Sequence, residues 1–320
     1  MKRIAVLTSG GDAPGMNAAI RAVVRTANFH HMEAYGVSRG YSGLIEGELQ
    51  MLSRRSVSDT IQRGGTILKT ARSDKFITYE GRKKAAEVLS ERGIDGLVVI
   101  GGDGSLRGAN ELWSEFGVKT VGVPGTIDND LGYTDKTIGF DTAVNTALSA
   151  INNLRDTMSS HDRVVIVQVM GRRSGEIALH AGLAGGAEVI LVPEKPVDFD
   201  DVAAVLNRGK AVGKSSGIVV LAEGACPLDE AMKELKERTG LSFRSTVLGY
   251  IQRGGSPTME DRVLASRLGV RAVELLKENQ GGRVVGIKGG KVIDLPIAEA
   301  LAIPPRFDEE LFEQAKMLSL

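Results

Sequence analysis

The residues best suited to chemistry form a glycine-rich turn with one embedded carboxylate, Gly-Gly-Asp-Gly-Ser at 101–105. The turn follows an apolar run ending at Ile100 and precedes a helical pattern, so glycines and a helix N-terminus would present backbone N–H groups to an anion. Ser105 is suited to cap that helix. Because a carboxylate repels phosphates, Asp103 would need a magnesium ion between them, and Mg²⁺ usually combines one or two carboxylates with phosphates and waters. The turn predicts a phosphate site, with a solvated aspartate in an ordinary glycine turn as the alternative.

A second candidate segment, PGTIDND at 124–130, also follows a predicted strand. Its carboxylates, Asp128 and Asp130, would point to opposite sides of an extended backbone. One could deprotonate an attacking hydroxyl while the other supports metal-bound water, a division of tasks found in phosphoryl transfer. An aspartate-rich turn is the alternative for this segment taken alone.

A third phosphate-competent turn, TSGGDAPG at 8–15, lies between a predicted strand and a predicted helix. Several arginines stand at predicted strand ends or in glycine loops, where a guanidinium can hold a phosphate through two hydrogen bonds. They belong to a set of six candidates: Arg72, Arg163, Arg172, Arg173, Arg244 and Arg253. For any one arginine a surface ion pair is the commoner role, so their position carries the prediction.

Two other motifs are rejected. The sequence GKAVGKS at 209–215 is one residue short of a P-loop and lies after a helix and before a strand, the reverse of the required order. The glycines at 102, 104 and 108 are spaced one residue too widely for a dinucleotide fingerprint. None of the four histidines lies in the glycine loops, so direct transfer to an acceptor hydroxyl is simpler than a phosphohistidine intermediate.

These loops are expected at the joints of an α/β fold. Short runs rich in Val and Ile, typical of buried parallel strands, occur at 4–7, 96–100, 119–123, 164–169, 189–192 and 218–221. Helical patterns lie at 16–28, 106–116, 142–158, 175–183, 202–207, 228–238 and 262–278. Strand and helix alternate, and open α/β sheets bind ligands at such joints.

Composition excludes several other classes. The 40 Lys and Arg balance the 40 Asp and Glu, so no overall field directs the chain to nucleic acid or membrane. The single cysteine, Cys226, allows no intrachain disulfide, and the apolar runs are too short for a signal peptide or membrane helix. We therefore expect a soluble cytoplasmic protein, and 320 residues favour two domains or one large one.

The two acidic motifs, together with MGR at 170–172, AEG at 222–224 and LGYIQRGGSP at 248–257, resemble bacterial ATP-dependent 6-phosphofructokinases over essentially the whole chain. The resemblance implies that MgATP phosphorylates fructose 6-phosphate to fructose 1,6-bisphosphate, the committed step of glycolysis. It implies a homotetramer of two similar three-layer α/β domains with mainly parallel sheets and the active site in the cleft between them. The ATP domain would comprise 1–139 and 252–305, and the fructose 6-phosphate domain 140–251 and 306–320.

The same resemblance assigns roles to individual residues. ATP would contact Gly11, Tyr41, Arg72, Ser73, Gly102, Asp103, Gly104, Ser105 and Gly108, with Mg²⁺ on Asp103. Asp128 would be the base, while Thr126, Arg172 and Gly11 complete the catalytic set. The sugar phosphate would contact Thr126, Asp128, Met170, Gly171, Arg172, Glu223, Tyr250 and Arg253, and a neighbouring subunit would supply Arg163 and Arg244.

The phosphoryl donor is indicated at two of these loops. Pyrophosphate-dependent relatives typically carry Asp in place of Gly104 and Lys in place of Gly125, and both positions are glycine here. The resemblance therefore implies ATP. A different kinase with a GGDG loop would lack the TIDND segment and this arginine set, and a non-catalytic nucleotide sensor would be expected to have lost Asp128 or Arg172.

An effector site for ADP or phosphoenolpyruvate is also implied, and here the chain departs from the family. The resemblance assigns it to Arg21, Arg25, Arg54, Asp59, Arg155, Gly186, Glu188 and Lys214. Arg21 and Arg25 stand one helical turn apart and repel each other unless an anion or acid lies between them; a solvated basic face is the alternative. Val212 and Ser215 replace family cations, which should weaken anion binding, and Tyr250 replaces a histidine beside the substrate phosphate.

Overall fold

The computed structural model describes residues 1–319 and divides into two compact units. Unit 1 is Met1–Asp141 with Arg253–Pro305, and unit 2 is Thr142–Gln252 with Arg306–Leu320. Residue 320, the end of the expected second domain, lies outside the described residues. Among the residues that are described, no helix is both long and apolar enough to cross a bilayer.

Unit 1 is built on a mixed sheet of order β12-β11-β5-β4-β1-β2-β3, with the short strand β6 also paired to β5. Its strands are β1 (Arg3–Thr8), β2 (Glu33–Val37), β3 (Leu49–Leu52), β4 (Gly96–Gly101), β5 (Thr120–Thr126), β6 (Ile138–Gly139), β11 (Arg283–Lys288) and β12 (Lys291–Pro296). The central strands are parallel, and only β3 and β12 run antiparallel to their neighbours.

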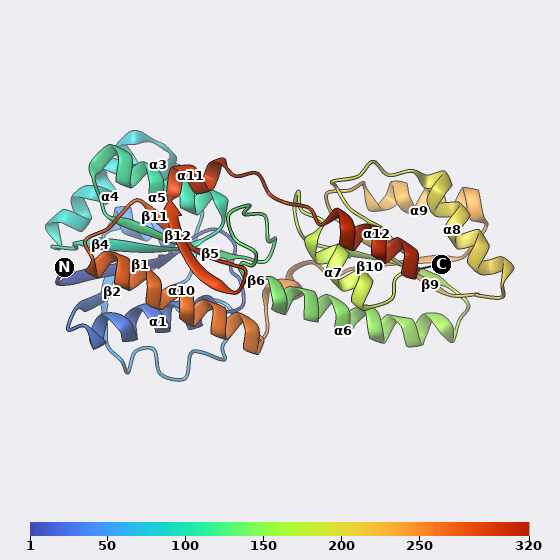
Figure 1. Ribbon diagram of the computed structural model, residues 1–320, viewed down its shortest axis with the longest axis horizontal. Coiled ribbons are helices and arrows are strands. Elements are labelled where there is room, and N and C mark those ends of the chain that lie inside the picture. Colours follow the sequence, from blue (N-terminus) through green and yellow to red (C-terminus); the bar gives the residue numbers. More distant parts are fainter. Residues whose placement is uncertain (320) are drawn as a thin grey trace. The chain divides into compact units, whose positions relative to one another are not determined.

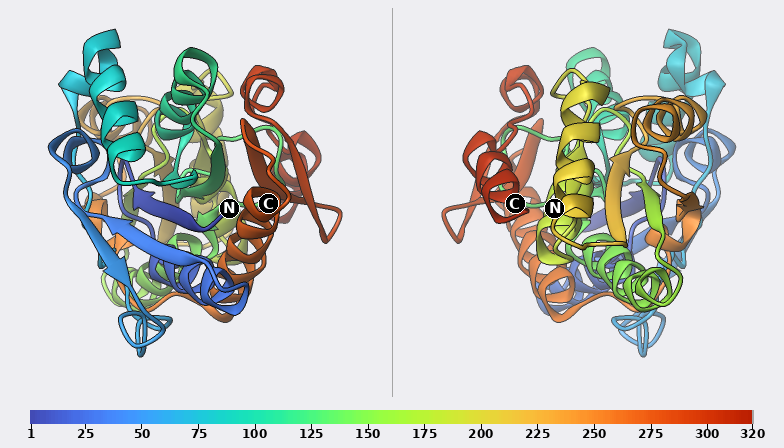
Figure 2. Two further views of the ribbon diagram at one scale, coloured as in Figure 1. Left: turned by 90° about the vertical axis from the view of Figure 1, so that its left-hand side faces the viewer. Right: turned by 90° about the vertical axis from the view of Figure 1, so that its right-hand side faces the viewer.

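Helices cover both faces of this sheet (Figures 1 and 2). One face carries α1 (Met16–Phe29) and α10 (Met259–Lys277), which pack against each other. The other carries α2 (Gly40–Glu46), α3 (Asp74–Ile77), α4 (Tyr79–Glu91), α5 (Asp103–Phe116) and α11 (Ile297–Ala302). Every residue of β4 is buried, as its continuous apolar run predicts for a central strand.

Unit 2 has a wholly parallel sheet of order β10-β7-β9-β8. Its strands are β7 (Val164–Val169), β8 (Val189–Leu191), β9 (Gly217–Ala222) and β10 (Phe243–Val247). Its helices are α6 (Phe140–Ser159), α7 (Glu176–Ala184), α8 (Phe199–Ala211), α9 (Leu228–Thr239) and α12 (Glu309–Leu318). The 3₁₀ turn η1 (Gly249–Arg253) follows β10 along the chain. Side chains of α8 and α9 form a core with the sheet, and α7 packs on β8 and β9.

The expected α/β class with two mainly parallel sheets is confirmed. Every predicted strand and helix is present, within a few residues of its expected ends. Two boundaries are wrong in ways that affect the loops. Strand β5 continues through residues 124–126, expected as loop, and α5 begins at Asp103, three residues before its expected start.

Candidate active site

Three acidic or glycine-rich loops of unit 1 begin side by side. They follow β1, β4 and β5, which are adjacent parallel strands, with Thr8 in register with Ile100 and Gly101 in register with Pro124. The backbone N–H of Ser9 donates to the carbonyl of Ile100 at 3.0 Å. The carboxyl ends of parallel strands share one edge of the sheet, where α/β proteins bind ligands.

The GGDGS segment is partly helical. Gly102 is the N-cap of α5 and no side chain caps the helix, so the expectation that Ser105 would do so is wrong. Because α5 starts at Asp103, Ser105 lies inside its first turn, and its N–H bonds to the carbonyl of Gly102 at 3.0 Å. Asp103 and Gly104 therefore stand at the positive end of the helix, where backbone N–H groups favour an anion.

Asp103 and Gly104 leave this helix end open. A Cβ at Gly104 would meet no atom within 4 Å, which indicates free space beside the loop. Asp103 instead bonds to Arg107 one turn later, with Nε to Oδ2 at 2.8 Å and Nη2 to Oδ1 at 3.0 Å. This hydrogen bonding raises the pKa of the Arg107 guanidinium. No group of three metal-ligating His, Cys, Asp or Glu side chains occurs within residues 1–319. One carboxylate beside open space fits Mg²⁺, which takes its remaining ligands from phosphates and water.

The TIDND loop is turned, not extended. Asp128 is only 4% exposed, and its N–H donates to Thr126 Oγ1 at 3.2 Å. Asn129 has a left-handed φ of 49°, so the expected arrangement of Asp128 and Asp130 on opposite sides of an extended strand is wrong. The Asn129 side chain accepts the N–H of Thr137 at 2.9 Å, and Thr137 Oγ1 donates to the carbonyl of Thr126 at 2.6 Å. These bonds fix the turn that presents Asp128.

The first loop is packed against an arginine that comes late in the sequence. Arg253 Nη1 donates to the carbonyl of Asp12 at 3.1 Å. A Cβ at Gly11 would overlap Nη1 and lie 2.8 Å from Cζ of Arg253, so a side chain at position 11 would displace this guanidinium. The hydroxyl of Thr70 donates to the carbonyl of Gly10 at 2.7 Å. Gly11 and Arg253, assigned to different substrates by the resemblance, thus lie in contact.

Tyr41 supports the GGDGS segment from beneath. Its ring is 5% exposed and stacks on Phe76, with ring centroids 3.8 Å apart, and its hydroxyl donates to the Ser105 carbonyl at 2.7 Å. Burial raises the pKa of this hydroxyl well above its usual value, so it stays a donor. A Cβ at Gly108 would lie 2.8 Å from the Phe76 ring and 3.0 Å from that of Tyr41. Glycine at position 108 therefore leaves room for the two stacked rings.

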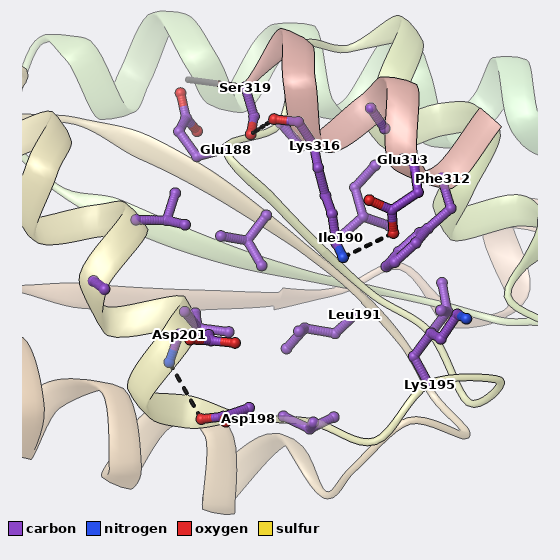
Figure 3. Close-up of a pocket in the computed structure, with 18 of the residues that line it drawn as sticks. Glu188, Ile190, Leu191, Lys195, Asp198, Asp201, Phe312, Glu313, Lys316 and Ser319 are labelled. Carbon is purple, nitrogen blue, oxygen red and sulfur yellow. Dashed lines mark hydrogen bonds and ion pairs between the residues drawn. The ribbon is translucent and has the colours of Figure 1, made fainter. Parts of the chain in front are cut away.

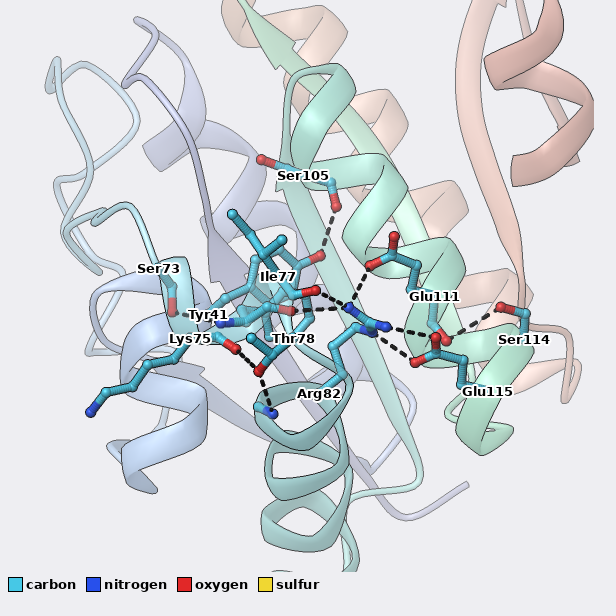
Figure 4. A network of polar contacts seen from close by, with 12 residues as sticks. Tyr41, Ser73, Lys75, Ile77, Thr78, Arg82, Ser105, Glu111, Ser114 and Glu115 are labelled. Atoms are coloured by element: carbon cyan, nitrogen blue, oxygen red, sulfur yellow. Dashed lines mark hydrogen bonds and ion pairs between the residues drawn. The ribbon is translucent and has the colours of Figure 1, made fainter.

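Arg82 of α4 holds the neighbouring segment in place (Figure 4). Its guanidinium binds Glu115 of α5 through two bonds of 2.7 Å and donates to the carbonyl of Ile77 at 2.5 Å. The short helix α3 begins at its N-cap Ser73, whose side chain accepts the N–H of Phe76. Phe76, Arg82 and Glu115 were not singled out from the sequence, because no local pattern signals that they meet.

Unit 2 brings together four of its expected site residues. Met170, Gly171 and Arg172 follow β7, and the backbone N–H of Arg172 donates to Glu223 Oε1 at 2.8 Å. Arg172 has a left-handed φ of 55°, which costs energy for a residue with a Cβ and is concentrated at functional sites. A Cβ at Gly171 would overlap the Ser174 carbonyl.

Other expected residues of unit 2 lie elsewhere. Arg163 immediately precedes β7 and Arg244 lies near the start of β10, whereas Met170 follows β7. A strand of that length spans roughly 20 Å, so one chain does not bring these arginines to Met170–Arg172. Tyr250, in η1, is 83% exposed.

The expected effector residues are divided between the two units. In unit 1, burial and then the charge of Arg25 lower the pKa of Arg21, while Arg54 and Asp59 lie in turns after β3. In unit 2, Arg155 donates to the carbonyls of Gly185 and Gly186 at 2.6 Å, and Glu188 forms an ion pair with Lys214.

Val212 and Ser215, the two positions where family cations are replaced, lie near the effector residues of unit 2. Val212 is 85% exposed, and the hydroxyl of Ser215 bonds to Asp162. Glu188 also lines a pocket of about 530 Å³ between β8, α8 and α12 (Figure 3).

Comparison with known proteins identifies the family. The family model described as phosphofructokinase matches residues 3–276. The chain belongs to the phosphofructokinase family. It is 60% identical to the ATP-dependent 6-phosphofructokinase of Clostridium tetani and 59% identical to that of Clostridium botulinum (strain Hall), over the full length of each pair.

Solved phosphofructokinase structures share this fold. The phosphofructokinase of Saccharomyces cerevisiae superposes with a TM-score of 0.89 at 36% identity, covering 100% of this chain and 48% of the yeast chain. The Marinobacter aquaeolei pyrophosphate-dependent phosphofructokinase gives 0.86 at 24% identity, covering 97% and 86%. The chain thus spans about half the length of the yeast protein. At 24% identity, the likeness to the Marinobacter aquaeolei protein shows the fold alone.

Proposed function

We propose that this chain is an ATP-dependent 6-phosphofructokinase that transfers the terminal phosphoryl group of ATP to the 1-hydroxyl of D-fructose 6-phosphate. The products would be ADP and fructose 1,6-bisphosphate, in the committed step of glycolysis. The observation that carries the proposal is 60% identity, over both full lengths, to a protein of that name. A cytoplasmic location accords with this step and with a single cysteine, Cys226.

Unit 1 supplies the proposed base and nucleotide site. Asp128, held by the turn after β5, would accept the proton of the sugar hydroxyl as it attacks in line. Gly11, Gly102–Ser105 and the Arg72–Ser73 segment would bind ATP, while Tyr41 and Gly108 keep the loop in position. Asp103 would hold Mg²⁺, which supplies positive charge against the phosphate oxygens when bound.

Unit 2 supplies most of the proposed sugar contacts. Glu223, oriented by the Arg172 N–H, and the Met170–Gly171 backbone would bind the sugar, while Arg172 and Thr126 stabilise charge on the transferring group. Arg253 of unit 1 would bind the 6-phosphate, joined by Tyr250.

A homotetramer with shared sites completes the proposal. Arg163 and Arg244 lie at the opposite ends of their strands from Met170–Arg172. This supports their use in the site of a neighbouring subunit.

Regulation by ADP or phosphoenolpyruvate is proposed for the two effector groups, and we expect it to be weak. Glu188 pairs with Lys214 and lies 3.8 Å from Arg155, which neutralises part of the positive charge in unit 2. Val212 and Ser215 add none. Titrating activity with each effector measures this directly.

A coupled assay tests the function. Fructose 6-phosphate is offered with ATP or with pyrophosphate, and ADP or phosphate release is followed. We expect turnover with ATP, and a loss of about 10²- to 10⁴-fold in kcat for Asp128→Asn, because proton transfer to a positioned base contributes that much. Wild-type turnover by Asp128→Asn, or turnover with pyrophosphate alone, contradicts the assignment.

A further inference from the structure

Arg107 forms an ion pair with Asp103, the carboxylate that would bind Mg²⁺ in the proposed function. Both oxygens of Asp103 accept hydrogen bonds from this one guanidinium, at 2.8 and 3.0 Å. The two residues are one turn apart on α5, with the acid nearer the N-terminus, which is the favourable orientation for such a pair. A magnesium ion binding Asp103 would therefore have to displace at least part of the pair.

The exposure of the pair limits its strength. The side chains of Arg107 and Asp103 are 57% and 40% exposed, so water competes with their attraction. An exposed ion pair is strong enough to shift a binding equilibrium by about 2- to 5-fold and too weak to block it. Mg²⁺ can therefore replace Arg107 as the partner of Asp103 when nucleotide binds.

We propose that Arg107 is an exchangeable counter-ion that competes with Mg²⁺ for Asp103 and so sets the magnesium concentration at which nucleotide binds. This inference rests on the proposed nucleotide site. It makes Arg107 a positioning residue: without metal it holds the Asp103 carboxylate in one rotamer and cancels its charge beside the phosphate site, and with metal it is released.

The competing role for Arg107 predicts the opposite sign. A cation beside a nucleotide site would ordinarily be expected to bind phosphates, and its removal would weaken nucleotide binding at every magnesium concentration. If Arg107 instead competes with the metal, its removal lowers the magnesium concentration needed. The two roles are therefore separated by binding measurements without turnover.

The experiment measures binding of an ATP analogue with nitrogen bridging the β- and γ-phosphorus, by calorimetry, over a series of free Mg²⁺ concentrations and without sugar phosphate. Arg107→Gln is expected to lower the half-maximal Mg²⁺ concentration by about 2- to 5-fold. Arg107→Lys, which keeps the charge but not the two-bond geometry, should lie between it and the wild type.

Two further variants serve as controls. Arg3→Gln breaks a similarly exposed pair with Glu33 at the far end of β1 and should leave the Mg²⁺ midpoint unchanged. In an Asp103→Asn background, Arg107→Gln should have no effect on the midpoint, because the shared carboxylate is gone.

The proposal is overturned by an unchanged or raised midpoint in Arg107→Gln, by an effect that persists with Asp103→Asn, or by wild-type binding that does not depend on magnesium. A chain that shows the expected midpoints but does not phosphorylate fructose 6-phosphate refutes the proposed function and leaves this inference standing.

Discussion

Gly11→Ala is the substitution whose effect the structure defines most sharply. The backbone at residue 11 is not left-handed, so alanine meets no conformational penalty there. Its methyl group would, however, overlap Nη1 of Arg253 and lie 2.8 Å from Cζ. The guanidinium must retreat by roughly 1 Å, and misplacement of that size can cost about 100-fold in kcat/KM. We therefore expect kcat/KM for fructose 6-phosphate to fall about 100-fold, or about 2.7 kcal/mol.

The assay compares KM and kcat for both substrates. The loss should appear chiefly in KM for fructose 6-phosphate, because Arg253 is the residue displaced, and should largely vanish in an Arg253→Met background. Gly209→Ala is the matched control, since its Cβ meets only Lys214, at 3.7 Å. A rise in KM for ATP alone, or additive losses in the double variant, would refute the reasoning.

Three further expectations concern single residues. Gly104→Asp should fold normally, since a Cβ there meets nothing within 4 Å. It should lower kcat/KM with ATP about 100-fold or more, because the new carboxylate repels the phosphates. An unchanged kcat/KM contradicts this. Tyr250→His should tighten fructose 6-phosphate binding more at pH 6 than at pH 8, because histidine becomes cationic near pH 6.5; equal effects at both pH values refute it. Burial opposes the charge of Asp294, but hydrogen bonds from Arg271 and Arg283 outweigh it and lower its pKa. Its stabilisation is therefore present above about pH 4 and lost as pH falls through the lowered pKa, so denaturant titrations of Asp294→Asn should show a flatter acid limb than the wild type.

The sequence predicts several strands that have apolar runs, including the edge strand β8, but misses others both at the sheet edges (β3, β10, β12) and inside the sheet (β2, β11). The runs LVVI at 97–100 and VVIV at 164–167 are apolar throughout, as burial on both faces requires. The segments EAYGV at 33–37, FRSTV at 243–247 and KVIDLP at 291–296 lack such a run, and β10 and β12 are edge strands. Their pairing is decided by neighbours that a local pattern does not reveal.

The sequence placed the candidate loops correctly after their strands, but it did not predict their internal geometry. Three glycine-rich or acidic segments were expected at strand–helix joints, and in the structure they follow the adjacent parallel strands β1, β4 and β5. The start of α5 was misplaced because Asp-Gly-Ser reads as a turn, whereas the end of β4 leads directly into the helix. The left-handed Asn129 and the Arg82–Glu115 pair depend on contacts distant in sequence. Roles assigned through family resemblance stay predictions.

The four-residue helix α3 has a consequence for local unfolding. One turn of helix does not persist by itself, because nucleation costs more than its few hydrogen bonds return. The Arg82 contacts and the Tyr41–Phe76 stack therefore stabilise α3. Amide hydrogens of residues 74–77 should exchange far faster than those of β4, and nucleotide binding should slow them selectively. This wall of the proposed nucleotide site can thus open as a separate cooperative unit while the sheet stays closed.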